Sequence, residues 1–213
     1  LRLKTLMEQS RKEQNEVSTR LSEQVLEALW ILVRGIDEAD QKAKVLGKTF
    51  LDDLPHSNPS HIYGGLITIL LRLVFLLYSE DEALMPVDTL FVQNYSVSGL
   101  AAKLRQDRIL FQGAMKDRYG AWCSLLSLFR LIFDGGGPYE SYLPARRGEL
   151  FDPDAFPFLE GRSKDSFYKN HLLQSIPLIS DDVIEKVLTK LLILDGQLLS
   201  YRSLDVEQIG SVY

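Results

Sequence analysis

The stretch HIYGGLITILLRLVFLLYSEDEALMPV at residues 61–87 decides the fold, because it holds the densest apolar run of the chain and ends in an acidic cluster. Its apolar residues recur at spacings of three and four, which places them on one helical stripe. That stripe comprises Leu66, Ile69, Leu70, Leu73, Val74 and Leu77. Ile67, Leu71, Phe75 and Leu76 widen the stripe. We therefore expect a central helix that is covered on more than one side.

The same run has a rival interpretation as a membrane span, which needs about 20 predominantly apolar residues. Arg72 lies in the middle of the run, and Glu80, Asp81 and Glu82 end it. Because a central arginine is costly in lipid, we expect a soluble protein with no membrane contact. Arg72 is then a buried charge that should pair with a carboxylate or a carbonyl group. Pro86 should stop the helix, since the residue before a proline disfavours helical geometry.

The composition is that of an ordinary globular protein, with 46% hydrophobic and 25% charged residues. The net charge of −5 argues against a free-standing nucleic-acid-binding protein, which usually has a basic face. One cysteine, Cys123, excludes an internal disulfide and a multi-cysteine zinc site, and its apolar setting predicts a packing thiol. No signal peptide is evident, so we expect a cytoplasmic protein. The ends at Leu1 and Tyr213 suggest a piece of a longer polypeptide.

The whole pattern predicts a mainly α fold, an irregular helical bundle with an extended aromatic-rich segment at residues 139–168. Residues 1–50 read as a long amphipathic N-terminal helix region, and residues 60–213 as a helical connector. Helices are expected from caps at Ser60 and Ser180, from Ser96 or Ser98 to Leu104, over residues 114–133, and from a cap at Ser203 or Asp205. Asp195-Gly196 predicts a tight turn. Phe151, Phe156 and Phe158 lack helical spacing and should anchor the aromatic-rich segment.

No set of residues has the spacing of a catalytic, cofactor-binding or metal site. The histidines are scattered and fit surface positions better than metal ligands: His56, His61 and His171. Gly135 to Gly137 follow a predicted helix and precede Pro138, which indicates a helix terminator rather than a nucleotide cradle. Pro153-Asp154 and Glu160-Gly161-Arg162 share the outline of a carboxylate-metal nuclease but lack its lysine. A glycine-rich cofactor turn and an Asn/Asp-Pro-Pro-aromatic motif are also missing from the sequence.

The basic pair Arg146 and Arg147 is the candidate DNA-contacting site. It lies in the sequence PARRG, just after Tyr139 and Tyr142. Arginines beside aromatic residues on an exposed loop suit contacts with phosphates or stacking on bases. The simpler interpretation is a surface or domain-contact pair that bridges Glu140 and Glu149.

Two longer stretches carry a resemblance to a known family: LPARRGELFDPDAFPFLEGR at 143–162 and VIEKVLTKLLILDGQLLSYRSLDVEQIGSVY at 183–213. They resemble the region just before the methyltransferase domain in type IIG-like restriction-modification and phage-defence adenine methylases, including those of the DISARM and BREX systems. Residues 72–87 and 119–136 resemble the helices that accompany these motifs in the family. The resemblance spans about residues 60–213, while residues 137–142 and 163–175 match no pattern of the family.

The resemblance implies a parent enzyme that transfers a methyl group from S-adenosylmethionine to adenine in DNA, which requires the base outside the duplex. The family's catalytic and cofactor motifs lie beyond this region, so the resemblance assigns no catalytic, cofactor or metal residue here. We expect a non-catalytic helical connector that contacts DNA through the parent enzyme, with other defence-system subunits as further partners. Whether the parent also cleaves DNA stays open. The alternative is a stand-alone helical module that binds a protein partner through its apolar faces.

Overall fold

The computed structural model describes residues 2–47, 51, 59–111, 113–139, 142–170 and 176–203, and for residues 2–18 it describes the backbone alone. The chain is mainly helical, with 68% helix and 4% strand, so the predicted fold class is confirmed. The α-helices are α1 (Arg2–Val45), α2 (Pro59–Asp81), α3 (Thr89–Asn94), α4 (Val97–Leu110), α5 (Gly120–Asp134) and α6 (Asp181–Leu192). Short 3-10 helices are η1 (Ala114–Asp117), η2 (Glu149–Phe151), η3 (Pro157–Glu160), η4 (Tyr168–Asn170) and η5 (Tyr201–Ser203). The strands β1 (Ile193–Leu194) and β2 (Gln197–Leu198) form an antiparallel hairpin.

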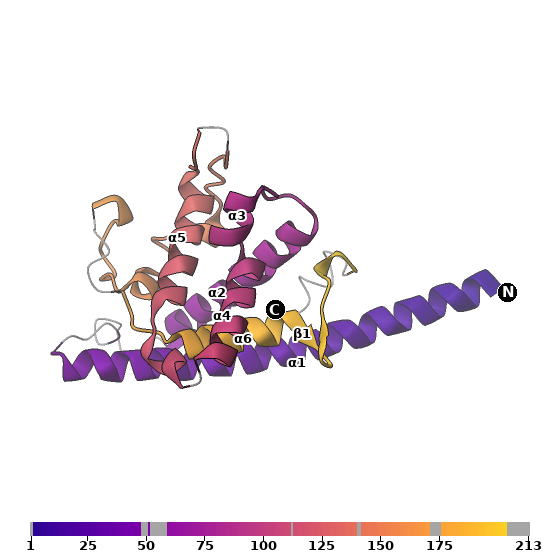
Figure 1. The fold of residues 1–213 in the computed structure, drawn as a ribbon, viewed down its shortest axis with the longest axis horizontal. Coiled ribbons are helices and arrows are strands. Elements are labelled where there is room, and N and C mark those ends of the chain that lie inside the picture. The colour runs from indigo at the N-terminus through magenta and orange to yellow at the C-terminus, as the bar shows by residue number, and fades with distance from the viewer. Residues whose placement is uncertain are drawn as a thin grey trace.

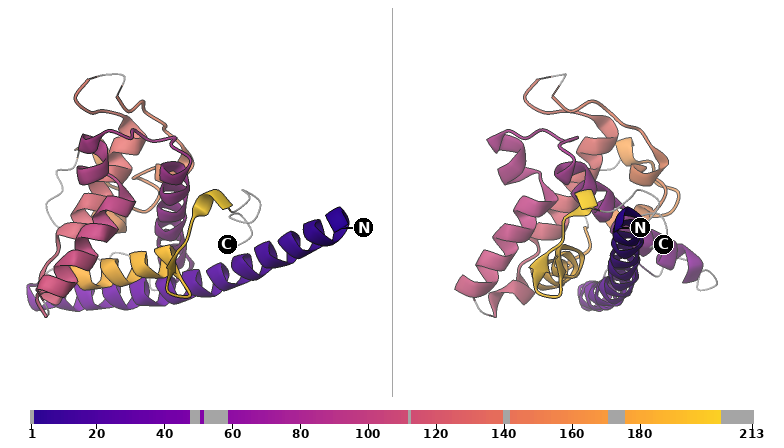
Figure 2. Two further views of the ribbon diagram at one scale, coloured as in Figure 1. Left: turned by 45° about the vertical axis from the view of Figure 1, so that its right-hand side comes forward. Right: turned by 90° about the vertical axis from the view of Figure 1, so that its right-hand side faces the viewer.

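Helix α1 packs mainly against α6 and also contacts α2. Figures 1 and 2 show α6 lying along α1, while the N-terminal part of α1 projects beyond the other elements. The α1 residues that face the body are buried: Leu21, Val25, Ala28, Leu29, Leu32, Ile36 and Ala39. Gly35 allows α6 to come close, because a Cβ there would lie 2.5 Å from Val183 Cγ1. The buried stripe of α1 therefore belongs to the same core as α2 to α6.

Helix α2 is the central buried helix that its sequence predicts. All six residues of its predicted stripe are at most 3% exposed, whereas Phe75 is 44% exposed. By length and composition the segment Ser60–Asp81 is able to cross a membrane, and 56% of its most apolar window is buried inside the protein. The helix begins at Pro59, so Ser60 lies inside it and the predicted cap is wrong. Proline suits the first turn of a helix because its missing N–H has no partner there anyway.

The structure corrects three other helix boundaries. Helix α2 ends at Asp81, so the prediction that Pro86 stops it is wrong. Ser96 is the N-cap of α4, and its Oγ accepts a hydrogen bond from Gly99 N at 2.9 Å as predicted, but the helix continues past Leu104 to Leu110. The predicted helix over 114–133 is divided into η1 and α5. The break lies at Arg118, whose backbone is extended with φ −109° and ψ 141°. The helical spacing of the apolar residues does not reveal a break of one extended residue.

The C-terminal elements follow their local sequence closely. Ser180 occupies the N-cap position of α6, although its side chain makes no capping hydrogen bond, and Asp181 and Asp182 fill the first turn. Asp195 and Gly196 have φ values of +52° and +79°, as a type I′ turn between two strands requires. The predicted tight turn is therefore confirmed. Of the two caps predicted for a last helix, Ser203 ends η5, and Asp205 lies outside the described residues.

The aromatic-rich segment lies between α2 and α5, and its described residues form no α-helix of their own. Phe151 lies between the two helices, with ring centroids 5.7 Å from Phe75 and 6.0 Å from Phe129. Phe158 is 2% exposed and packs over Gly65 of α2. The segment is thus anchored by its phenylalanines, as the sequence predicts.

Candidate functional site

Arg146 and Arg147 lie at the C-terminal end of α5. After that helix, the chain turns through Gly135 to Gly137 and comes back along the helix end. Arg146 N donates to Ile132 O at 3.0 Å, and Arg147 N donates to Phe133 O at 3.2 Å. These carbonyls belong to the last turn of α5 and have no partner within the helix. The backbone of the two arginines therefore caps α5.

The side chains of both arginines are exposed to solvent. Within the part of the chain that the structure describes, neither guanidinium forms an ion pair or a hydrogen bond, so neither is paired with Glu149. Glu140, the other predicted partner, lies outside the described residues. Positive charge suits the C-terminal end of a helix because of the helix dipole. Arg147 has φ +42°, a left-handed conformation that is uncommon for a residue other than glycine.

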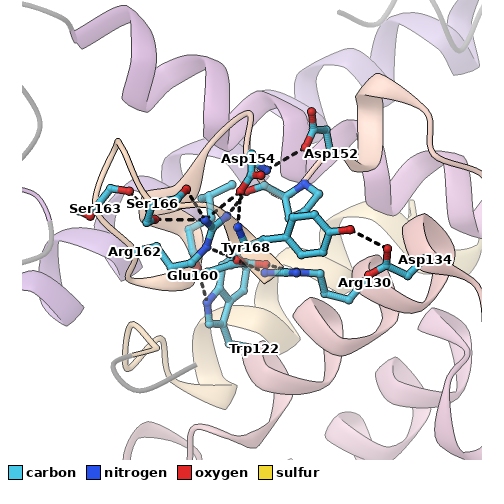
Figure 3. Close-up of polar contacts among 12 residues, drawn as sticks. Trp122, Arg130, Asp134, Asp152, Asp154, Glu160, Arg162, Ser163, Ser166 and Tyr168 are labelled. Atoms are coloured by element: carbon cyan, nitrogen blue, oxygen red, sulfur yellow. Dashed lines mark hydrogen bonds and ion pairs between the residues drawn. The ribbon is translucent and has the colours of Figure 1, made fainter. Parts of the chain in front are cut away.

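The segment after Phe151 encloses a cluster of buried charges (Figure 3). Its centre is the Glu160 carboxylate, whose side chain is 6% exposed. Arg130 of α5 donates to it from Nε and Nη2, both at 2.6 Å, and Arg162 donates to it from Nε at 2.6 Å. Such two-pronged bonds between guanidinium and carboxylate are among the strongest polar contacts in proteins. Glu160 thus joins α5 to the aromatic-rich segment.

Arg162 uses its remaining donors within the same segment, and its side chain is 3% exposed. Its Nη1 lies 2.9 Å from Asp154 Oδ1 and donates to Ser166 O at 2.9 Å. Asp154 and Glu160, which outline a nuclease site in the sequence, are therefore both held by arginine. Among the described residues no group of three or more His, Cys, Asp or Glu side chains is placed to hold a metal ion. This arrangement suits a structural role.

Tyr168 connects the charge cluster to the end of α5. Arg130 Cζ lies 4.4 Å from the centre of its ring, and its hydroxyl donates to Asp134 Oδ1 at 2.8 Å, as Figure 3 shows. Burial raises the pKa of Tyr168, the hydrogen bond to Asp134 raises it further, and the charges of Arg130 and Arg147 oppose both effects. Arg147 is therefore close enough to act on the Tyr168 hydroxyl.

Arg72 is the buried cation predicted in the central helix, and it is 4% exposed. Its Nε donates to Leu150 O at 2.6 Å and its Nη2 donates to Asp152 O at 3.0 Å, which confirms the predicted carbonyl partner. Its Cζ also lies 5.2 Å from the centre of the Phe129 ring. Burial lowers the pKa of Arg72 to about 10, so the side chain stays charged at neutral pH. Arg72 thus holds the aromatic-rich segment from α2, as Arg130 holds it from α5.

The other residues singled out in the sequence have structural positions. Cys123 is half-buried, and burial raises the pKa of its thiol. His61 packs against Phe156 and Phe158, with ring centroids 5.1 and 5.7 Å away. His56 and His171 lie outside the described residues. Gly135 has φ +75° and its N–H bonds to Leu131 O at 2.9 Å, so its predicted role as a helix terminator is confirmed.

An apolar groove between α1 and α2 is the second feature open to a partner. Its volume is about 310 Å³, and it is lined by Leu29, Trp30, Val33, Ile62, Tyr63 and Leu66. Trp30 and Tyr63 are 59% and 55% exposed. Large aromatic side chains exposed on a helix surface are typical of protein contact sites.

No protein-family model, curated protein or solved structure matches this chain. The charge cluster around Glu160 is not among the predictions from the sequence, although the sequence contains a signal for it. Arg72 and Arg130 are the only cations in α2 and α5, the two most apolar helices. A single arginine inside an apolar helix must find buried acceptors, and both of these find them in the aromatic-rich segment.

Proposed function

We propose that the chain is a non-catalytic helical connector of a bacterial adenine-specific DNA methyltransferase that acts in restriction-modification or phage defence. The parent enzyme would work in the cytoplasm and take its methyl group from S-adenosylmethionine. One observation carries the proposal: the stretch 143–162, one of the two that resemble the family, also binds arginines of both α2 and α5. Phe151, Glu160 and Arg162 in it are all buried, and the two charged side chains form ion pairs. These three residues of the motif therefore have a structural role.

A connector role agrees with the contacts that the acidic residues of this stretch make. The acidic residues Asp154 and Glu160 are engaged by arginines, and Asp152 keeps a hydrogen bond from Asp154 N at 2.9 Å. Side chains held in this way fix the shape of a segment rather than act on a substrate. In the proposal, Arg146 and Arg147 are the DNA-facing residues, and the other subunits of the defence system are further partners.

The test is a methyl-transfer assay on the full-length parent protein with tritium-labelled S-adenosylmethionine and genomic DNA from a host that lacks the system. We expect label in N6-methyladenine with the parent protein, and no label with residues 1–213 alone. Label in cytosine, or no transfer by the parent protein, contradicts the proposal. Transfer by residues 1–213 alone contradicts the non-catalytic role.

A second candidate function is a stand-alone module that binds a protein partner. The exposed Trp30 and Tyr63 in the α1–α2 groove favour it. The reading frame after Tyr213 discriminates between the two functions. A glycine-rich cofactor turn followed by an Asn-Pro-Pro-aromatic motif supports the methyltransferase connector, and their absence supports the stand-alone module.

A further inference from the structure

We propose that the C-terminal end of α5 binds an unpaired DNA strand. The binding surface, here called the α5-end surface, consists of Arg146, Arg147, Phe167, Tyr168 and Lys169. That the partner is DNA rests on the proposed function. That the strand is unpaired follows from the chemistry of the surface.

The surface offers three positive side chains that form no ion pair with a carboxylate of the described residues. They are those of Arg146, Arg147 and Lys169, and all three are exposed. Arg130 lies against the Tyr168 ring, but its charge is paired with Glu160. Asp134 is a carboxylate at this surface, and its Oδ1 accepts a hydrogen bond from the Tyr168 hydroxyl. Free guanidinium and ammonium groups are suited to the phosphates of a nucleic acid backbone.

A chain of contacts links the separate segments that carry these cations. Arg147 N donates to Phe133 O at 3.2 Å, and the ring of Phe133 meets the ring of Tyr168 edge-on at 5.8 Å. Lys169 Nζ lies 5.8 Å from the centre of the same Tyr168 ring. Tyr168 therefore connects Lys169 to Phe133, whose carbonyl holds the backbone of Arg147.

The surface also carries an aromatic ring that a base is able to stack on. Phe167 is 51% exposed, and its ring centroid lies 5.4 Å from that of Tyr168. Its segment is fixed, because Tyr168 N donates to Asp154 Oδ1 at 3.0 Å and Asn170 N donates to Phe167 O at 3.0 Å. Bases in a duplex are stacked on each other, whereas an unpaired base leaves a face free for an aromatic side chain. Cations together with an exposed ring thus favour a single strand over a duplex.

The test measures binding of the chain to a fluorescein-labelled oligothymidylate and to the same strand paired with its complement, by fluorescence anisotropy between 50 and 200 mM salt. We expect tighter binding of the single strand. Replacing Arg146 and Arg147 together by alanine should reduce the log–log salt slope by about 1.4, because each phosphate contact on a single strand contributes about 0.7. Lys169→Ala should reduce it by about 0.7. Phe167→Ala should weaken binding about tenfold and leave the salt slope unchanged.

Two control variants separate the surface from general charge effects. Replacing Arg146 and Arg147 by lysine keeps the charge and should keep the slope. Lys103→Ala removes an exposed cation of α4 and should change neither the affinity nor the slope. Duplex binding as tight as single-strand binding, or a native slope in the double alanine variant, overturns the α5-end surface.

The two proposals fail in different ways. Adenine methylation by a parent enzyme whose surface variants bind the strand normally contradicts the α5-end surface and leaves the proposed function standing. Salt-dependent strand binding by a chain whose parent transfers no methyl group contradicts the proposed function and leaves the surface standing.

Discussion

At the scale of single residues, Asp182 shows how a carboxylate at a helix start joins two helices. Its Oδ1 accepts from Arg108 of α4 at 3.0 Å and its Oδ2 accepts from Lys186 at 2.7 Å. It also lies in the first turn of α6, where the helix dipole favours negative charge. Burial acts to raise the pKa of Asp182, but Lys186 and then Arg108 lower it more, so the pKa lies below its usual value.

Asp182→Asn should therefore destabilise the chain in a pH-dependent way. A lowered folded-state pKa contributes stability above the unfolded value of 3.8, and this contribution is lost as pH falls through the folded value. We expect the variant to lower the free energy of unfolding by about 1 to 3 kcal/mol at pH 7 and by less at pH 3. Urea unfolding at the two pH values measures the difference. Asp117→Asn is the control, because Asp117 is exposed. An equal loss for Asp182→Asn at both pH values would contradict the role of its charge.

At the scale of elements, two adjacent glycines of α2 differ in what they face. A Cβ on Gly65 would lie 2.6 Å from Phe158 Cζ, whereas a Cβ on Gly64 would lie 3.4 Å from Phe156 Cζ. Phe158 is buried and has no room to move, while the contact at Gly64 is close to ordinary van der Waals distance. The aromatic-rich segment thus depends on the missing side chain of one glycine.

Alanine at these two positions should have opposite effects. Alanine is favoured over glycine inside a helix by about 1 kcal/mol, so Gly64→Ala should leave stability unchanged or raise it slightly. Gly65→Ala should lower the free energy of unfolding by about 1 to 3 kcal/mol, because it overpacks the contact with Phe158. Thermal unfolding followed by circular dichroism compares the pair. Equal melting temperatures would show that Phe158 is not held against α2.

The elements differ in how far their sequence predicts them. The stripes of α2 and α6 were predictable because burial on one side of a helix repeats every three or four residues. The break at Arg118 and the extension of α4 to Leu110 were not predictable, since periodicity is weak at helix ends. In the aromatic-rich segment the sequence predicts that the phenylalanines are buried, but it does not predict that Glu160 binds Arg130, because that pair depends on tertiary packing.

At the scale of the whole molecule, Glu160 joins α5 to the segment that also contacts α2. The indole Nε1–H of Trp122 donates to Leu159 O, next to Glu160 in the sequence, at 3.2 Å, so Trp122 reports on this junction. Removing one partner of a buried ion pair costs about 3 to 5 kcal/mol, because the remaining charge is left without a partner. Two guanidiniums share Glu160, one from α5 and one from the segment itself.

Glu160→Gln should consequently loosen the segment as a whole. In a Trp30→Phe background, in which Trp122 is the remaining tryptophan, we expect a red shift of its fluorescence at low urea and a loss of about 3 to 5 kcal/mol in unfolding free energy. Glu149→Gln is the matched control, since Glu149 is exposed and lies in the same segment. A native emission maximum and native stability in Glu160→Gln would contradict the central role of this carboxylate.

The contacts of Arg72 have a consequence for the order in which the chain folds. Its acceptors, Leu150 O and Asp152 O, are 78 and 80 positions further along the sequence. Such distant pairings pay the entropy of closing a long loop before they gain any contact, so they form late in folding. Interactions that form after the transition state affect the rate of unfolding more than the rate of folding. Substitutions at Arg72 should therefore shorten the lifetime of the folded chain while leaving its refolding rate almost unchanged.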